Sequence, residues 1–315
     1  MLILTMESIL DWGVGVIVWL QRFSPAVDLP FRALTFLGDE GFFVLFLPFL
    51  YWSVDRRTGA RLMVLFLVSG LASCVAKSLA DQPRPFEYSD QVRQLGPASG
   101  GGLPSGHTQN AVVVWGYLAW QLRRRWAWVG AALLMLFIPL SRLYLGVHFP
   151  TDLLGGYVLG AVIFVLFVWL GPRVEGWLSR KGIVWQLVAA ALPCVLLALP
   201  LPQRAGGGGE VAAGATLAGM GIGFALERRW VGFESAGTWR SRLLRFALGG
   251  AVLFGGWWAK QAVLWGAEPA VPLRFAWYLL LGLAGALAAP WAFVKLRLAG
   301  SRASAEAKGS GLEAS

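Results

Sequence analysis

Long apolar stretches separated by short polar segments dominate the chain, and they determine the fold class. A stretch of about 18 or more apolar residues is long enough to cross a bilayer as a helix. Backbone polar groups within hydrocarbon must bond to one another, which makes helices the expected spanning structure. The predicted spans are 33–53, 60–80, 105–122, 125–145, 150–171, 183–203, 211–227, 242–266 and 272–294. We therefore predict an all-α, polytopic transmembrane helix bundle of about nine spans.

The first apolar stretch differs from the others. Residues 8–20 are too short to span comfortably and contain Asp11. We interpret them as an interfacial helix, with a short first span as the alternative. The predicted organisation is an N-terminal interfacial segment over 1–32, core helices over 33–171, additional C-terminal transmembrane helices over 172–300, and a polar tail over 301–315.

Composition and charge support a membrane protein. The chain is 57% hydrophobic and 14% charged, with a mean hydropathy of +0.61, whereas soluble domains have about a quarter of their residues charged. The net charge of +10 would also suit nucleic-acid binding. However, most of the 27 Lys and Arg residues lie in short loops that this layout places on one side. Membrane orientation by the positive-inside rule explains them better, so no nucleic-acid partner is predicted.

Three separated segments contain polar residues that a membrane protein does not retain without a reason. The layout places all three at the outer ends of predicted spans, so we expect them to converge on one site. The segments are Lys77 with Arg84-Pro85, then Pro104-Ser105-Gly106-His107, then Ser141-Arg142 with His148 and Asp152.

The third segment has the pattern of an activated nucleophile. His148 and Asp152 are four residues apart near the first turn of a helix that Pro150 opens, so their side chains can meet. A carboxylate bonded to one ring nitrogen fixes the tautomer and leaves the other nitrogen free to attack. Arg142 ends the preceding span and offers a fork of donors that fits phosphate oxygens.

The other two segments add anion-binding groups. Ser105 and Gly106 open a helix, where a hydroxyl and backbone N–H groups can bind an anion. His107 then lies beside that anion and could donate a proton to a leaving oxygen. Lys77 and Arg84 supply further positive charge, which phosphoryl transfer requires.

Each residue taken alone has an ordinary structural interpretation. A histidine at a helix end is usually structural, an arginine at a membrane boundary usually anchors the helix, and Asp152 could cap a helix. The joint pattern favours chemistry, because the chain has only two histidines and both lie in these segments. Two histidines and one aspartate make a poor closed metal site, so no metal is predicted.

On these residues the chain resembles the membrane-bound type 2 phosphatidic acid phosphatase (PAP2) superfamily, which shares its active site with vanadium haloperoxidases. The signatures of that family are Lys, six residues, Arg-Pro; then Pro-Ser-Gly-His; then Ser-Arg, five residues, His, three residues, Asp. Every specified position matches in this chain. The resemblance covers about residues 33–171.

The resemblance implies a role for each motif residue. His148 would be the nucleophile that forms a phosphohistidine, and Asp152 would orient it. His107 would protonate the leaving alkoxide and later help to activate water. The implied phosphate-binding residues are Lys77, Arg84, Ser105, Gly106 and Arg142. The resemblance implies neither a metal nor another cofactor.

The predicted function is hydrolysis of a lipid phosphate monoester or pyrophosphate by a multi-pass protein of the cell (inner) membrane, with the site facing the outer, periplasmic side. The alternatives are a lipid phosphotransferase that uses the same site, or a non-enzymatic transporter of a lipid or anion. The expected partners are the bilayer and a membrane lipid phosphate. The pattern specifies neither the particular lipid nor the oligomeric state.

Overall fold

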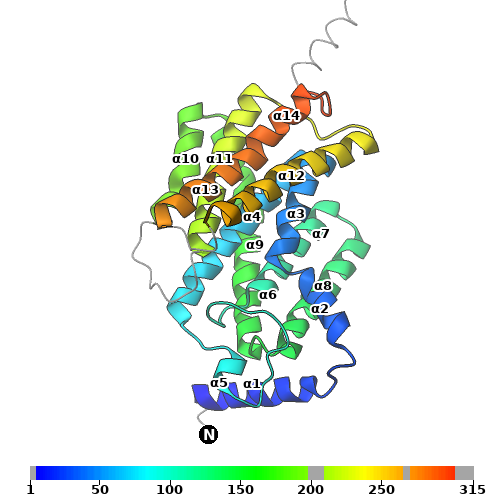
Figure 1. Cartoon of the computed structure of the whole chain (residues 1–315), viewed down its shortest axis with the longest axis vertical. Helices are drawn as coiled ribbons and strands as arrows, with labels where there is room; N and C mark the ends of the chain where they lie inside the picture. The colour runs from blue at the N-terminus through cyan, green and yellow to red at the C-terminus, as the bar shows by residue number, and fades with distance from the viewer. Residues whose placement is uncertain (1–4, 198–208, 265–269, 302–315) are drawn as a thin grey trace, which may run out of the picture. The chain divides into compact units, whose positions relative to one another are not determined.

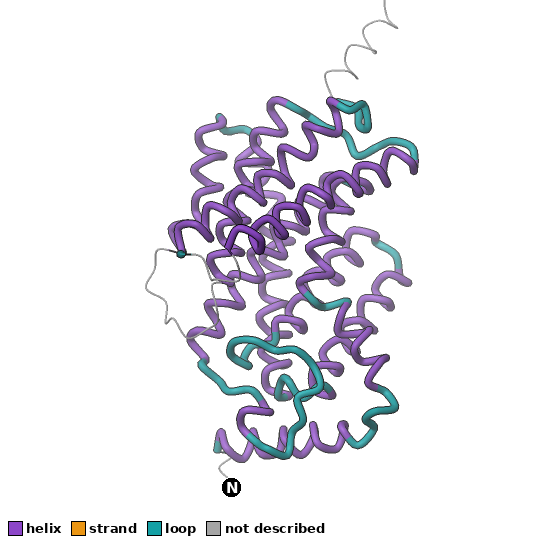
Figure 2. The backbone as a smooth tube through the Cα atoms, in the orientation of Figure 1, coloured by secondary structure: helices purple, strands orange, loops and turns teal. Residues whose placement is uncertain are grey.

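The computed structural model describes residues 5–197, 209–264 and 270–301, which fold into helices joined by loops (Figures 1 and 2). Within those ranges the only strand-like pairing is an isolated β-bridge between Phe233 and Ser301. The predicted all-α class is therefore confirmed for the described residues. The α-helices are α1 (Met6–Gln21), α2 (Asp28–Phe36), α3 (Glu40–Phe49), α4 (Arg56–Ala80), α5 (Pro85–Tyr88), α6 (Gly106–Asn110), α7 (Gly116–Leu122), α8 (Arg125–Tyr144), α9 (Pro150–Ser179), α10 (Ile183–Leu197), α11 (Gly209–Trp230), α12 (Trp239–Leu264), α13 (Val271–Leu283) and α14 (Ala289–Lys295).

The chain folds into two compact units. Unit 1 consists of Met1–Phe43, Ser69–Gly171 and Leu201–Gly209, and unit 2 consists of Val44–Val68, Pro172–Pro200 and Glu210–Ser315. All three predicted motif segments belong to unit 1. The division of the chain into four consecutive segments remains a prediction. The two units are defined by spatial contact, and each combines separate stretches of the chain, so they do not test that division.

Five of the described helical stretches are long and apolar enough to cross a membrane. They are Arg56–Tyr88, Arg125–Tyr144, Pro150–Ser179, Gly209–Trp230 and Val271–Lys295. A sixth span arises if α2 and the helix Glu40–Val54, which meet at a bend of 47°, are counted as one. The protein is therefore a multi-pass helical membrane protein.

The predicted number of nine spans remains a prediction. The stretch predicted over 105–122 is divided into α6, a π-helical turn (Ala111–Trp115) and α7. The stretch predicted over 183–203 forms α10 up to Leu197, and the rest of it lies outside the described residues. The stretch predicted over 242–266 corresponds to α12.

In unit 1, α8 is the central helix and contacts α1, α2, α6 and α7. Its small residues Ala127 and Ala131 are buried against Ala119 of α7, which lets the two backbones approach closely. The opposite face of α8 exposes large apolar side chains such as Leu133 and Leu136. An apolar exposed face of this kind fits contact with lipid.

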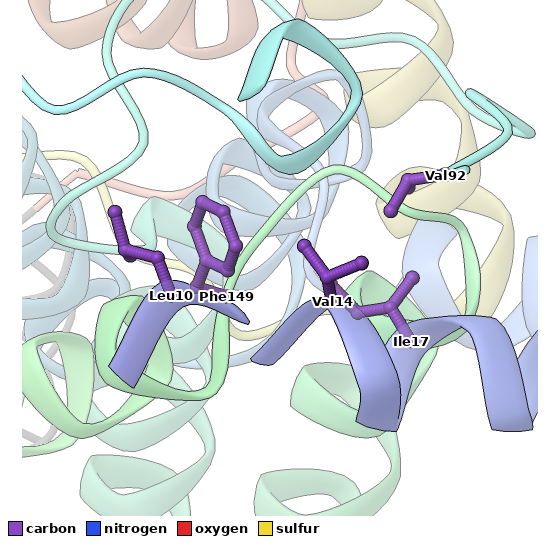
Figure 3. Close-up of a cluster of buried hydrophobic side chains, with 5 residues drawn as sticks. All are labelled: Leu10, Val14, Ile17, Val92 and Phe149. Carbon is purple, nitrogen blue, oxygen red and sulfur yellow. The ribbon is translucent and has the colours of Figure 1, made fainter. Parts of the chain in front are cut away.

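Helix α1 covers one end of unit 1 (Figure 1). Its buried residues Leu10, Val14 and Ile17 follow helical spacing and pack with Val92 and Phe149 (Figure 3). Helix formation over the first apolar stretch is therefore confirmed, while its position at the membrane interface remains a prediction. Because Phe149 directly follows His148, this packing supports the loop that carries the predicted nucleophile.

Close approach between α9 and α6 brings two of the motif segments together. A Cβ atom on Gly156 would lie 2.6 Å from the carbonyl oxygen of Ser105, and one on Gly160 would lie 3.0 Å from Cβ of Val112. Only glycine leaves enough room for this contact, and two glycines four residues apart form a GxxxG pair, which permits such close approach of helices. The contact places the first turn of α9 beside the start of α6.

Candidate active site

A histidine and a carboxylate form the buried centre of the candidate site. His148 lies in the loop after α8, and Asp152 lies in the first turn of α9. Nδ1 of His148 is 3.1 Å from Oδ2 of Asp152, and both side chains are buried. The same carboxylate oxygen accepts a hydrogen bond of 2.9 Å from the backbone N–H of Phe149. The predicted i, i+4 meeting of His148 and Asp152 is present.

The guanidinium group of Arg84 lies on the other side of the His148 ring, next to Nε2. Its Nη1 is 3.4 Å from Nε2 of His148 and donates a 2.7 Å bond to the carbonyl of Val147. Its Nε and Nη2 donate to the carbonyls of Gly100 and Ser99 at 2.8 and 2.6 Å. The guanidinium group is therefore fixed directly beside the nitrogen that Asp152 leaves free.

Lys77 and Arg142 bind the same stretch of backbone as Arg84. Nζ of Lys77, in the last turn of α4, donates to the carbonyl of Gly101 at 2.5 Å. Nη2 of Arg142, in the last turn of α8, donates to the carbonyl of Pro97 at 3.2 Å, and its Nη1 donates to Oγ1 of Thr35 at 2.8 Å. We call residues 97–101 the carbonyl loop, because its oxygens accept from all three predicted phosphate-binding cations.

The remaining motif residues begin α6. Ser105 is the N-cap of α6, and its Oγ accepts from the N–H of Thr108 at 3.4 Å. Its own N–H donates to the carbonyl of Asp152 at 2.9 Å, which joins the second and third segments. Gly106 is the first residue of α6 and His107 the second. The structure therefore brings every predicted site residue into one part of unit 1.

The electrostatic surroundings of His148 favour a neutral ring. Burial, followed by the neighbouring charges of Arg142, Lys77 and Arg84, holds the pKa of His148 well below its usual value of 6.5. A neutral imidazole has the free lone pair that a nucleophile needs. Among the described residues, no group of three or more His, Cys, Asp or Glu side chains could hold a metal ion.

Two side chains near the histidines were missed by the sequence reasoning. Nε2 of Gln82 donates to Oδ1 of Asp152 at 2.7 Å, so both carboxylate oxygens have partners. Oδ2 of Asp39, in the loop between α2 and α3, lies 3.8 Å from Nε2 of His107. Both residues are ordinary polar residues outside the motif positions, and only their position in space reveals them.

Fold and site together define a class of protein: a helical membrane protein with a buried His–Asp pair among three converging cations. Residues 58–175 match the PAP2 superfamily, and residues 211–301 match the transmembrane extension of PAP2 superfamily phosphatases. The chain therefore contains a PAP2 superfamily domain, followed by the transmembrane extension of PAP2 superfamily phosphatases. The family resemblance predicted from the three motifs is confirmed.

Individual relatives are phosphatases, and their names include both lipid phosphates and a sugar phosphate: glucose-6-phosphatase 3 of Homo sapiens is 30% identical over 213 residues, which cover 59% of this chain and 60% of the relative. Lipid phosphate phosphatase delta of Arabidopsis thaliana is 28% identical over 211 residues, which cover 61% of this chain and 50% of the relative. Sphingosine-1-phosphate phosphatase 2 of Mus musculus is 32% identical over 143 residues, covering 43% and 40%. The chain thus spans between 40% and 60% of the length of these curated relatives. A solved structure, the transmembrane PAP2 type phosphatidylglycerolphosphate phosphatase from Bacillus subtilis, is similar over 52% of this chain and 86% of its own, with 23% identity and a TM-score of 0.44.

Proposed function

We propose that this protein hydrolyses a lipid phosphate through a phosphohistidine on His148. The observation that carries the proposal is the fixed geometry of this ring: Asp152 holds Nδ1 at 3.1 Å while Arg84 lies 3.4 Å from Nε2. A carboxylate on one nitrogen and a guanidinium group beside the other orient the ring for attack at a phosphorus atom. Membership of a family of membrane lipid phosphate phosphatases supports the proposed substrate class.

In the first step, the Nε2 lone pair of His148 attacks phosphorus and the bond to the leaving oxygen breaks. His107 gives its proton to that oxygen, so an alcohol leaves rather than an alkoxide. Asp152 stabilises the positive charge that develops on the ring of His148. Lys77, Arg84 and Arg142 neutralise the phosphoryl oxygens, which is the main electrostatic demand of this reaction.

In the second step, water replaces His148 on phosphorus. His107, now neutral, accepts a proton from the water as it attacks, which regenerates the protonated ring. The P–N bond breaks and its electron pair returns to His148. Inorganic phosphate leaves, and both histidines recover their starting protonation states.

The position of the site along α8 supports a lipid substrate. This helix begins at Arg125, the last residue of a basic run over 123–125, and has Arg142 in its last turn. At 1.5 Å per residue the two groups of charges are roughly 25–30 Å apart, about the thickness of the hydrocarbon core. A site at that boundary lets the acyl or prenyl tail stay in the bilayer while the headgroup reaches the cations. The positive-inside rule then assigns the site to the outer, periplasmic face of the inner membrane.

The decisive experiment is phosphate release by the purified full chain in detergent, with phosphatidic acid, a sphingoid phosphate, phosphatidylglycerol phosphate and undecaprenyl pyrophosphate. We expect His148→Ala to lose release from every lipid, because the substitution removes the proposed nucleophile. Gln91→Ala, in an exposed loop, serves as the matched control and should keep wild-type turnover. Wild-type turnover in His148→Ala would rule out the mechanism.

A second measurement separates hydrolysis from its alternatives. With ³²P-labelled lipid and a rapid quench, label should appear on the protein in a form that is stable to base and labile to acid, as phosphohistidine is. Transfer of that label to an added acceptor lipid rather than to water would identify a phosphotransferase. Lipid or anion flux that survives in His148→Ala without phosphate release would identify a transporter.

A further inference from the structure

The loop between α2 and α3 places a carboxylate beside the second histidine. Oδ2 of Asp39 lies 3.8 Å from Nε2 of His107, close enough for an ion pair. Nε2 itself is buried and has no hydrogen-bond partner. The Asp39 side chain is 45% exposed, so part of it remains uncovered by the protein while Oδ2 lies near the His107 ring.

Hydrogen bonds fix the position of this loop. Oδ1 of Asp39 accepts a 2.7 Å bond from the N–H of Gly41 at the start of α3, which is the arrangement of an N-cap. Nε1 of Trp115 donates to the carbonyl of Leu37 at 3.2 Å. Because one carboxylate oxygen caps the helix, the other is held toward His107.

Tight packing also holds the loop against the histidine. A Cβ atom on Gly38 would lie 2.5 Å from Cγ2 of Ile138 and 3.3 Å from Cδ2 of His107. The first distance is shorter than any real contact, so only glycine lets the backbone come this close. Asp39, the next residue, is placed beside the ring by the fold itself.

Burial and the charges of Arg142, Lys77 and Arg84 hold the pKa of both histidines well below 6.5, but different charged groups lie next to the two rings. His148 is beside the guanidinium group of Arg84, where positive charge suits the phosphoryl oxygens. The nearest carboxylate to His107 is Asp39, which is partly exposed and also interacts electrostatically with Arg142. Negative charge at this position is unfavourable for any second anionic group of a substrate.

We propose that Asp39 is a specificity-determining residue that favours phosphate monoesters over pyrophosphates. This inference rests on the proposed function, because it requires His107 to lie on the side of the leaving group. An alcohol leaving group needs a proton from His107, and Asp39, 3.8 Å from Nε2, is the carboxylate placed to attract that ring when it is protonated. A pyrophosphate has a phosphate anion as its leaving group, which needs no proton and is repelled by a nearby carboxylate.

A pair of substrates with the same tail tests the proposal: farnesyl phosphate and farnesyl diphosphate, assayed with the full chain in detergent. We expect Asp39→Asn, which keeps the cap on Gly41, to shift the ratio of the two kcat/KM values toward the diphosphate by roughly tenfold or more. Asp39→Glu, which restores the charge, should move the ratio back toward the wild-type value. Asp90→Asn removes one exposed negative charge elsewhere in unit 1 and should leave the ratio unchanged.

A third substrate distinguishes this role from a purely structural one. Nitrophenolate leaves without a proton, so Asp39→Asn should slow farnesyl phosphate hydrolysis but leave p-nitrophenyl phosphate hydrolysis near the wild-type rate. An unchanged substrate ratio in Asp39→Asn, or equal losses on all three substrates, would overturn the assignment. If the wild-type chain releases phosphate from none of them, the proposed function fails and this inference fails with it.

Discussion

Buried charges occur in both units, but they are arranged differently. In unit 2, the carboxylate of Glu227 is fully buried, pairs with Arg56, and accepts a 2.8 Å bond from the N–H of Phe233. Arg245, also buried, donates to the carbonyls of Glu234 and Ser235 at 3.1 and 2.8 Å. These buried charges bond within the fold, Glu227 to Arg56 and Arg245 to main-chain oxygens.

In unit 1, by contrast, three cations converge around a single buried carboxylate. The positive charges of Lys77, Arg84 and Arg142 all lower the pKa of His148, and Asp152 is the carboxylate that pairs with its ring. Excess positive charge in a buried place is costly unless an anion binds there. Balanced charge indicates a structural role, whereas unbalanced charge indicates a binding site for an anion. The predictions below test this distinction.

The largest effect is expected in unit 1 from Asp152→Asn. The amide keeps the size of the side chain but cannot stabilise a positive ring or hold the same tautomer of His148. A comparable change in a serine protease triad lowers kcat about 10⁴-fold, so we expect a loss of about 10³–10⁴-fold here. Phosphate release measured beside thermal unfolding in detergent checks this prediction, and a proportional loss of stability would contradict it.

The next largest effect is expected in unit 2 from Glu227→Ala. Removing one partner leaves the Arg56 charge unpaired, which should lower the free energy of unfolding by about 3–5 kcal/mol. Activity per folded molecule should stay close to wild type. The double variant Arg56→Met with Glu227→Leu should recover most of the stability, because two apolar side chains need no partner. Chemical unfolding in mixed micelles measures both variants beside the wild type, and no recovery in the double variant would argue against a structural pair.

A smaller effect is expected from Gln82→Leu. We expect Gln82 to affect the reaction only indirectly, through Asp152. Its Nε2 donates a hydrogen bond of 2.7 Å to Oδ1 of Asp152. By analogy with residues that orient metal ligands, we expect kcat to fall about 10-fold or somewhat more. KM should change little, because the cations that bind phosphate are untouched. Gln82→Glu should be worse than Gln82→Leu, since it adds a second negative charge beside Asp152, and the reverse order would exclude the positioning role.

The smallest effect concerns pH. Burial and the cations lower the pKa of His148 below 6.5, so its neutral, nucleophilic form should persist below that pH. The acid limb of kcat/KM should therefore lie below pH 6.5, since this limb reports the free enzyme. The unfolded chain binds a proton near 6.5 and the folded ring does not, so the contribution of His148 to stability should decline as the pH falls below 6.5.

NMR can check that pKa directly, because the chain has only two histidines. With ¹⁵N-labelled histidine, the His107→Gln variant assigns the remaining signal to His148. A midpoint at or above pH 6.5 would contradict the prediction and remove the basis for the pH profile.

The chemical residues of the site were predictable from sequence because their spacing is rigid. His148 and Asp152 are four residues apart at a helix start, and the structure shows the predicted contact. Gln82 and Asp39 could not be predicted in this way, because a single amide or carboxylate in a loop has no distinctive spacing. Their roles depend on how α4, α9 and the loop before α3 come together.

The helices were predictable as apolar stretches, but their interruptions were not. The bend of 47° between α2 and the following helix places Asp39 beside His107, and no glycine or proline pattern specifies its angle. Likewise, the π-helical turn that divides the helix over 105–122 cannot be recognised from the hydropathy of that stretch. Hydropathy reports how long an apolar stretch is, whereas the course of the backbone depends on packing.

The carbonyl loop has a consequence for product release. The N–H groups of Lys77, Arg84 and Arg142 that would bind a phosphate already bond to backbone oxygens of this loop. A phosphate bound by these particular donors would compete with the protein's own main chain, and this competition would lower its affinity. A lipid headgroup is concentrated at the site by its tail, about 0.8 kcal/mol for each buried CH₂, whereas free inorganic phosphate has no such help. Under the proposed mechanism, this competition would favour the departure of inorganic phosphate over that of a lipid phosphate.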